Sequence, residues 1–202
     1  MLEIVIGTTN PGKLREFRTL LEDLPVTLLS LEDAGLAGMD VEETGSTFAE
    51  NARIKAEAYA RASGKHALAD DSGLCVAALD GAPGLYSARY GDPGLDDQGR
   101  RLKLLNALQD VTAREAHFEC VITLMAPDGT EITQAAGRVD GHIMQDDQDG
   151  PQGFGYDAIF QPEGHNVSFA QLPKDEKNRI SHRGRAAVIF KQNLAVWLAT
   201  RS

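Results

Sequence analysis

Four carboxylates in two short segments could bind a metal ion. Asp70 and Asp71 follow an apolar run, and Glu42 and Glu43 lie in an acidic segment that precedes a predicted helix. Hard oxygen ligands of this kind suit Mg²⁺, which takes one or two protein carboxylates together with water and substrate phosphates. Taken alone, "DDSG" at 70–73 is also typical of a polar turn without a metal. The four residues together favour a magnesium site that serves phosphate chemistry.

The segment "GTTNPGK" at 7–13 has the residues of a phosphate-binding loop. It connects an apolar run at 2–6, typical of a buried strand, to a predicted helix. The backbone N–H groups at a helix N-terminus favour an anion, and the side chains of Thr8, Thr9, Asn10 and Lys13 add donors. The spacing is not that of the Walker loop. A tight turn in which Asn10 caps the helix is the alternative interpretation of this segment.

A lysine on the second predicted helix is a further candidate for phosphate binding. Asn51 and Lys55 are four residues apart in "TFAENARIKAEAYARASG", so they share one face of that helix. A lone lysine on a helix is usually a solvated charge. Here several alanines and Ile54 surround it, which indicates that part of the helix is buried. A lysine at the border of a buried face can point into a cleft.

Two late segments could bind a purine base. Phe154 and Tyr156 in "GFGYD" offer aromatic faces, and Lys177, His182 and Arg183 are hydrogen-bond donors just before or at the start of the last predicted helix. A base with a carbonyl group needs such donors. The sequence contains no nucleophile elbow, zinc-binding pattern or dinucleotide-binding fingerprint.

The pattern along the chain predicts the elements that would position these residues. Strands are expected at 2–6 and 26–29, and helices at 47–63 and 97–108. The segment 66–79 is expected to form two strands that meet at the acidic turn. A long alternating strand at 116–125, a partner strand ending near 139 and a last helix at 184–199 follow. Helical and strand patterns alternate early and a meander follows, which predicts an α/β fold with a mixed sheet in one domain, residues 1–202.

Composition restricts the partners. The chain has 202 residues, a formal net charge of -10 and a sequence pI of about 4.9. Binding to a nucleic acid or an anionic membrane needs a clustered excess of Lys and Arg, so neither partner is expected. The two cysteines, Cys75 and Cys120, lie far apart in apolar segments and lack metal-ligand spacing. We therefore expect reduced thiols and a cytoplasmic location.

Six motifs in a fixed order carry a resemblance to a known family. The motifs "TTNPGK", "EETGSTFAENARIKA", "ALADDSGL", "GAPGLYSARY", "GFGYD" and "SHRG" resemble the inosine/xanthosine triphosphate pyrophosphatase family over nearly the whole chain. The resemblance implies removal of pyrophosphate from ITP, dITP and XTP, which cleanses the nucleotide pool. It also implies a two-lobed α/β protein with a long mixed sheet, a substrate cleft between the lobes, a Mg²⁺ requirement and a homodimer.

The resemblance also implies roles for particular residues. Asp71 is the expected proton acceptor, Asp70 supports it, and Lys55 acts on the phosphates. Glu42 and Asp71 are the expected metal ligands, although the sequence leaves open whether Glu42 or Glu43 takes that place. The expected substrate-binding residues are Thr8, Thr9, Asn10, Pro11, Gly12, Lys13, Ser72, Phe154, Gly155, Tyr156, Asp157, Lys177, His182 and Arg183.

Three stretches depart from the family pattern. Ala158 stands where proline is usual, and "DDQGR" at 96–100 replaces the commoner Asp-Gln-Lys-Asn. Neither of these two stretches is assigned to the chemistry, so we expect them to affect only local loop geometry. The stretch around "LPKDEK" at 172–177 also differs, although Lys177 keeps its place.

Base selectivity and two alternatives complete the expectations. A 6-oxo purine accepts hydrogen bonds from His182 and Arg183, whereas the 6-amino group of adenine would place a donor against donors. The first alternative is a Maf-like pyrophosphatase of modified nucleotides, which the two purine-end motifs disfavour. The second is a nucleotide sensor without turnover, which the acidic residues disfavour because they would repel a triphosphate unless a metal bridged them.

Overall fold

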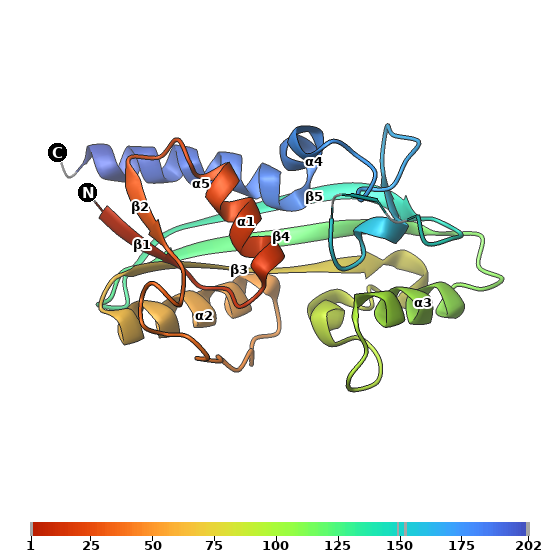
Figure 1. Cartoon of the computed structure of the whole chain (residues 1–202), viewed down its shortest axis with the longest axis horizontal. Coiled ribbons are helices and arrows are strands. Elements are labelled where there is room, and N and C mark those ends of the chain that lie inside the picture. Colours follow the sequence, from red (N-terminus) through yellow and green to blue (C-terminus); the bar gives the residue numbers. More distant parts are fainter. Residues whose placement is uncertain (1, 149, 152, 201–202) are drawn as a thin grey trace. The chain divides into compact units, whose positions relative to one another are not determined.

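A computed structural model describes residues 2–148, 150–151 and 153–200. The glycine-rich loop expected before Asp157 includes positions 149 and 152, which lie outside the described residues. The principal elements are β1 (Leu2–Ile6), α1 (Pro11–Leu20), β2 (Val26–Leu29), α2 (Phe48–Ser63), β3 (His66–Val76), α3 (Asp97–Ala107), β4 (Glu115–Met125), β5 (Glu131–Ile143), β6 (Phe160–Pro162), α4 (Lys174–Ile180) and α5 (His182–Ala199) (Figure 1).

The strands form one mixed sheet with the order β2-β1-β3-β4-β5-β6. β1 is parallel to both β2 and β3, whereas β6 is antiparallel to β5. The predicted "PDGT" turn joins β4 to β5, and Ala126 N donates to Thr130 O across it at 2.8 Å. The expected α/β fold with a mixed sheet is confirmed.

Two compact units share the chain. The first unit comprises Met1–Asp71, Cys120–Gly137 and Arg183–Ser202, and the second comprises Ser72–Glu119 and Arg138–His182. Three boundaries between the units fall inside strands β3, β4 and β5, so each of these strands contributes residues to both units.

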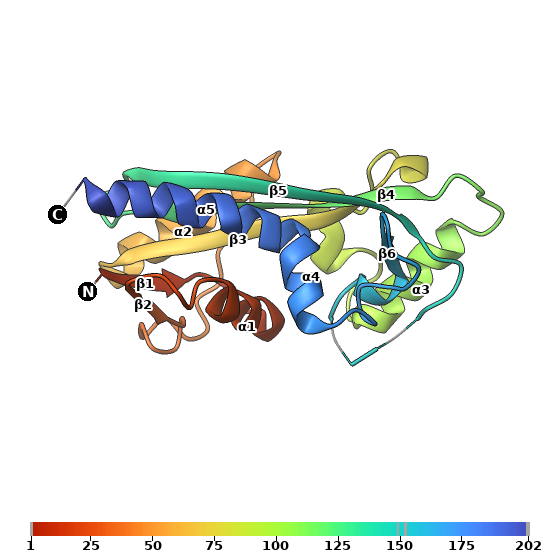
Figure 2. The same ribbon diagram turned by 90° about the horizontal axis from the view of Figure 1, so that it is seen from above.

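In the first unit the alternation of strand side chains separates two helical layers. Ile4 and Leu68 pack with α1 and α5, whereas Val5, Ala67 and Ala69 pack with α2. Figure 1 shows α2 on one side of the strands and α5 on the other, and Figure 2 shows α5 lying along the strands. Because successive strand residues point to opposite faces, Asp70 shares the face of Leu68 and the next residue, Asp71, shares the face of Ala69.

The helix boundaries follow from capping chemistry. Asn10 Oδ1 accepts from Gly12 N at 2.8 Å and from Lys13 N at 3.1 Å at the start of α1. Thr47 Oγ1 accepts from Glu50 N at 3.1 Å at the start of α2, and α2 ends at Gly64, whose φ is 64°. Both N-caps satisfy backbone donors that a helix leaves unpaired, as the sequence predicts. Pro173 precedes α4, a short helix that the sequence analysis did not predict.

The prediction of two strands around an acidic turn at 66–79 is wrong. A single strand, β3, passes through "DDSG" without a turn. Gly73 is required there for close packing, because a Cβ atom at this position would lie 2.2 Å from Gly84 O and 2.7 Å from Ser87 Oγ. Gly73 therefore permits the close approach of β3 to the segment Gly84–Arg89, which forms a 3₁₀ helix.

The second unit has an aromatic core. Phe118 contacts Phe160 edge-on with ring centroids 4.8 Å apart, and Phe160 contacts Phe169 at 5.2 Å. Leu104 and Leu108, from α3 and the residue after it, belong to the same buried cluster. This packing fixes α3 within the second unit.

Candidate active site

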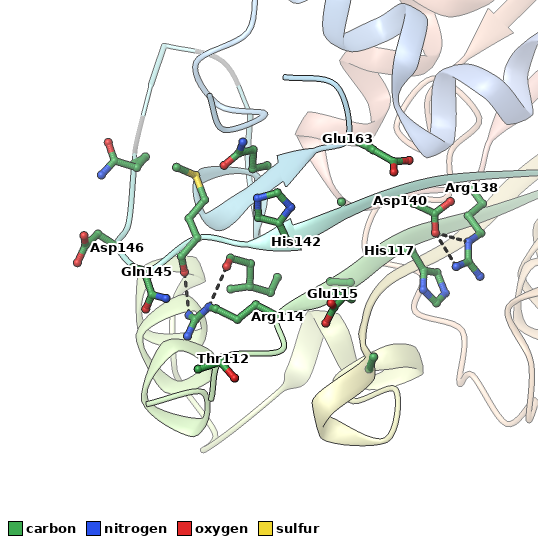
Figure 3. A pocket seen from close by; sticks show the side chains of 17 residues that line it. Thr112, Arg114, Glu115, His117, Arg138, Asp140, His142, Gln145, Asp146 and Glu163 are labelled. Carbon is green, nitrogen blue, oxygen red and sulfur yellow. Dashed lines mark hydrogen bonds and ion pairs between the residues drawn. The ribbon is translucent and has the colours of Figure 1, made fainter. Parts of the chain in front are cut away.

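A hollow of about 780 Å³ in the second unit contains none of the predicted site residues (Figure 3). It lies over parts of β4 and β5 and over the segment that follows β5. Three of its charged side chains are engaged with one another or with the backbone. Arg138 pairs with Asp140 at 2.6 Å, and Arg114 donates to the carbonyl oxygens of Ile143 and Met144 at 2.9 and 2.8 Å. Several predicted site residues lie instead in polar clusters along β3.

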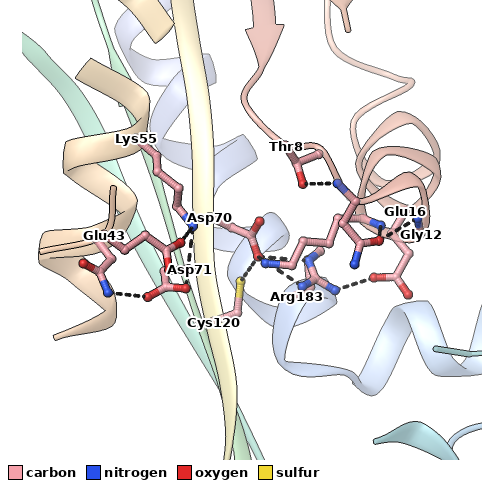
Figure 4. Close-up of polar contacts among 12 residues, drawn as sticks. Thr8, Gly12, Glu16, Glu43, Lys55, Asp70, Asp71, Cys120 and Arg183 are labelled. Carbon is pink, nitrogen blue, oxygen red and sulfur yellow. Dashed lines mark hydrogen bonds and ion pairs between the residues drawn. The ribbon is translucent and has the colours of Figure 1, made fainter. Parts of the chain in front are cut away.

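Asp71 lies in a cluster on the α2 face of β3 (Figure 4). Asn51 Nδ2 donates to Asp71 Oδ2 at 3.0 Å, and Lys55 Nζ lies 3.6 Å from Asp71 Oδ1. Lys55 also forms an ion pair with Glu43. Two carboxylates thus flank one ammonium group, with a neutral amide beside them. We call Glu43, Asn51, Lys55 and Asp71 the α2-face cluster.

Helix α2 and the segment before it assemble this cluster. Asn51 and Lys55 are separated by one helical turn, as the sequence predicts. The buried side chain of Asn51 also accepts from Gly45 N at 2.8 Å through Oδ1. A Cβ atom at Gly45 would lie 2.7 Å from that oxygen, so glycine permits the close approach. Asn51 therefore joins the backbone near Glu43 to the carboxylate of Asp71.

The same geometry distinguishes the two neighbouring glutamates. Glu43 is half-buried and pairs with Lys55, whereas Glu42 is exposed. Glu43 is also near enough to Asp71 for its charge to raise the pKa of that carboxyl group. The sequence analysis assigned Glu42 through the resemblance and left Glu43 open, and the α2-face cluster contains Glu43.

Burial and charge shift the proton affinities in the α2-face cluster. Burial, supported by the negative charge of Glu43, raises the pKa of Asp71, although Lys55 and Asn51 act in the opposite direction. Burial would lower the pKa of Lys55, but the charges of Asp71, Asp70 and Glu43 outweigh it and raise that pKa. At neutral pH the cluster thus presents a fixed cation beside a carboxylate with an enhanced affinity for protons.

Asp70 lies in a separate cluster on the opposite face of β3. Its Oδ2 atom is 3.0 Å from Lys13 Nζ and 3.0 Å from Arg183 Nη2, and Arg183 Nη1 pairs with Glu16 Oε2 at 2.5 Å. Cys120 Sγ donates to the same Asp70 oxygen at 3.7 Å. We call Lys13, Glu16, Asp70, Cys120 and Arg183 the α1–α5-face cluster. Although Asp70 and Asp71 are adjacent in the sequence, they belong to different clusters and do not form one acidic pair.

The pKa of Asp70 in the α1–α5-face cluster is strongly perturbed. Asp70 is 2% exposed, and burial by itself would raise its pKa. The charges of Lys13 and Arg183 more than offset burial and hold the pKa of Asp70 well below its usual range. Asp70 Oδ1 is buried without a hydrogen-bond partner among the described residues. Burial and the charge of Asp70 raise the pKa of the Cys120 thiol, which remains a donor.

The loop at 7–13 has the capping geometry of the alternative interpretation. Asn10 occupies the N–H groups of Gly12 and Lys13, and Asn10 N donates to Thr8 Oγ1 at 3.2 Å. Pro11 begins α1 and Thr9 is exposed. The cap is confirmed, and phosphate binding by this loop stays a prediction.

The expected base-binding residues of the second unit form a third group. Asp157 Oδ2 accepts from Phe154 N and from Lys177 Nζ, both at 2.8 Å, and Lys177 Nζ lies 5.1 Å from the centre of the Phe154 ring. The Tyr156 hydroxyl donates to Ser87 O at 2.9 Å.

The two donors of "SHRG" have different surroundings. His182 is buried and stacks on Phe118 at a centroid distance of 4.7 Å within the second unit. Arg183 belongs to the first unit and to the α1–α5-face cluster. The roles of His182, Arg183 and the neighbouring residues in base recognition stay predictions, as does substrate contact by Ser72.

The model of the Ham1 family matches residues 4–193 of this chain. The chain belongs to the Ham1 family. The dITP/XTP pyrophosphatase of Synechocystis sp. is 49% identical over 188 residues, which cover 92% of each chain. The dITP/XTP pyrophosphatase of Geobacter sulfurreducens is 46% identical over 96% of this chain and 97% of its own length. Both similarities extend over nearly all of the Ham1 chain.

Solved Ham1 structures share the fold. A HAM1 protein from Coxiella burnetii matches with a TM-score of 0.86 and 43% sequence identity, covering 96% of this chain and 99% of that one. The Ham1 protein of Staphylococcus aureus matches with a TM-score of 0.83 and 42% identity, covering 96% and 98%. The mixed sheet with flanking helices is therefore the Ham1 fold.

The sequence assigns no site role to three residues that the Ham1 structure places in the clusters, namely Asn51, Glu16 and Cys120. Asn51 was noted only as a neighbour of Lys55, and its spacing from Lys55 was the available signal. Glu16 follows Lys13 by three residues, which puts opposite charges on one face of α1. Its pairing with Arg183 had no local signal, because the two residues are far apart in the chain.

Proposed function

We propose that this Ham1 chain hydrolyses the non-standard purine nucleoside triphosphates ITP, dITP and XTP to the monophosphate and pyrophosphate. The assignment to phosphoanhydride hydrolases rests on curated relatives that align over nearly the full length. The α2-face cluster is the observation that carries the chemistry, because it places the carboxylate of Asp71 3.6 Å from the partly buried ammonium group of Lys55. A nucleotide sensor without turnover would not need that combination.

Asp71 and Lys55 have complementary tasks in this reaction. Water attacks the α-phosphorus, and Asp71 accepts the proton that the water loses. Lys55 stabilises the negative charge that increases on the phosphate oxygens. Asn51 holds the Asp71 carboxylate through one oxygen and leaves the orientation of the group fixed.

Glu43 and Asp71 are the residues that would hold Mg²⁺. Two carboxylates suit this ion, which commonly takes one or two from the protein and the rest of its ligands from water and substrate phosphates. The described residues contain no group of three or more His, Cys, Asp or Glu side chains arranged for a metal. When bound, the ion supplies positive charge that offsets the triphosphate and the pyrophosphate leaving group.

The two glutamates allow a matched test of the metal site. Glu43→Gln is expected to raise the Mg²⁺ concentration for half-maximal activity at least about tenfold, because even partners outside the ligand shell commonly affect affinity by that much. Glu42→Gln is expected to behave as the wild type, because Glu42 is exposed. Magnesium titrations of dITP turnover with both variants measure this. A larger effect at Glu42 than at Glu43 would assign the ligand to Glu42 instead.

Base selectivity belongs to the purine end of the substrate. Donors such as Lys177, His182 and Arg183 fit a 6-oxo purine, and a 6-amino purine would leave buried donors unpaired. That mismatch is worth about 1–3 kcal/mol, or roughly 5–150-fold in kcat/KM. A cytoplasmic homodimer is part of the same proposal. In the described part of the chain, no helix is both long enough and apolar enough to cross a membrane.

A substrate panel tests the proposed function. We expect Mg²⁺-dependent release of pyrophosphate from dITP, ITP and XTP, with ATP and GTP turned over more slowly. A coupled assay with inorganic pyrophosphatase measures the release. A preference for modified pyrimidine nucleotides would support the Maf-like alternative, and nucleotide binding without pyrophosphate release would support the sensor.

A further inference from the structure

Helix α3 contacts both sides of the Gly155 backbone. Gly155 N donates to Asp97 Oδ2 at 2.9 Å, and Arg101 Nη1 donates to Gly155 O at 3.0 Å. Asp97 and Arg101 are four residues apart on α3, so both side chains leave the same face of the helix. The two polar groups of one glycine are thus held by a single helix.

Arg101 contacts a second point of the polypeptide at the same time. Its Nε atom donates to Asp147 Oδ2 at 2.8 Å. The planar guanidinium therefore connects Asp147 with Gly155, and both contacts use its fixed fork geometry. Arg101 is only 9% exposed, which distinguishes this ion pair from the solvated pairs on the surface of α3. We call Asp97, Arg101 and Asp147 the α3 clamp.

Gly155, whose backbone the α3 clamp holds, lies between Phe154 and Tyr156, which are both expected to contact the base. Gly155 has a φ of 60°, in the left-handed region that favours glycine. Phe154 N donates to Asp157 Oδ2, which also accepts from Lys177 Nζ. A change in the Gly155 peptide would therefore shift the Phe154 ring and the Asp157 carboxylate together. The departure "DDQGR" includes Asp97, so it reaches the base-binding segment after all.

We propose that the α3 clamp positions the Phe154–Asp157 segment for base recognition and thereby contributes to selectivity for 6-oxo purines. Asp97 and Arg101 are positioning residues, because they act through the Gly155 backbone. The proposal rests on the proposed function, since it assumes that Phe154, Asp157 and Lys177 bind the base. A clamp with only a structural role would support folding and affect all nucleotides equally.

The test compares variants of one helix. Arg101→Met keeps a long apolar stem and removes the fork, and Asp97→Asn removes one charge of the clamp while preserving size. Lys103→Met is the matched control, because Lys103 lies on α3 and pairs with the exposed Asp92 at 3.3 Å. Each protein is measured for its melting temperature and for kcat and KM with dITP and dATP.

Arg101→Met is expected to raise KM for dITP and to reduce the dITP-to-dATP ratio of kcat/KM by about tenfold, with kcat for dITP nearly unchanged. Asp97→Asn is expected to change the ratio in the same direction by a smaller factor, and Lys103→Met to leave it unchanged. A folded Arg101→Met with the wild-type ratio, or with equal losses for both nucleotides, overturns the proposal. If Arg101→Met does not fold, the ratio in Asp97→Asn decides by the same criterion.

The wild-type protein separates this proposal from the proposed function. Wild type that does not release pyrophosphate from dITP contradicts the proposed function itself. Wild type that hydrolyses dITP selectively, together with a selective Arg101→Met, contradicts only the α3 clamp.

Discussion

Asp71→Asn is expected to fold and to lose about 10²–10⁴ in kcat with dITP, because it removes the positioned proton acceptor. The substitution preserves the shape of the side chain, and its amide oxygen can still accept from Asn51 Nδ2. Burial and Glu43 raise the pKa of Asp71, so its charged form is disfavoured in the folded protein. Loss of that charge is therefore not expected to lower the free energy of unfolding.

Kinetics and urea denaturation on the same preparation measure both parts of this expectation. Pyrophosphate release gives kcat, and the unfolding midpoint shows that the variant is folded. A folded Asp71→Asn with nearly wild-type kcat would exclude Asp71 as the proton acceptor.

In contrast to Asp71→Asn, Asp70→Asn is expected to lower the free energy of unfolding. The expected loss is about 3–5 kcal/mol, which is the usual effect of breaking a buried ion pair. The Asp70 carboxylate lies between the cations Lys13 and Arg183 and is almost fully buried. Without that charge, both cations lose the carboxylate that lies 3.0 Å away, although Arg183 retains its ion pair with Glu16. Urea denaturation at neutral pH measures the difference.

The pH dependence of this difference has a defined sign. Because the folded-state pKa of Asp70 is lowered, its contribution to stability is complete above the unfolded-state pKa of about 4. It is lost as the pH falls through the folded-state pKa. The stability difference between wild type and Asp70→Asn should therefore remain constant from neutral pH to about pH 5 and shrink in stronger acid. A difference below about 1 kcal/mol at neutral pH would mean that the pair contributes no more than a surface ion pair.

Local sequence patterns were sufficient for the elements that local chemistry controls. The start of α2 at Thr47 and its end at Gly64 follow from a capping residue and a residue that tolerates positive φ. The cap at Asn10 and the turn between β4 and β5 are local in the same way. Each depends on residues within a few positions of one another.

The strand through "DDSG" shows where local patterns were insufficient. Asp, Ser and Gly favour turns, and a central strand tolerates Asp70 only because Lys13 and Arg183 compensate its charge. Arg183 is distant in the sequence, so no local pattern reveals this pairing. The sequence also could not show that Asp70 and Asp71 serve different clusters, because that follows from strand alternation once the turn is excluded.

The candidate metal ligand and the contacts of Arg101 have similar explanations. Glu42 and Glu43 are neighbours in an irregular segment, and only tertiary packing brings Glu43 into contact with Lys55. The contacts of Arg101 with Asp147 and Gly155 join residues that are more than forty positions apart. Such contacts depend on tertiary packing, which periodicity and capping do not encode.

Hydrolysis of dITP in ¹⁸O-labelled water tests the central claim most directly. If water attacks the α-phosphorus, mass spectrometry will find dIMP and pyrophosphate in equal amounts, with the label in the phosphate of dIMP. Asp71→Asn should form the same labelled product much more slowly. Release of dIDP and inorganic phosphate, or label in pyrophosphate in place of dIMP, would contradict the account.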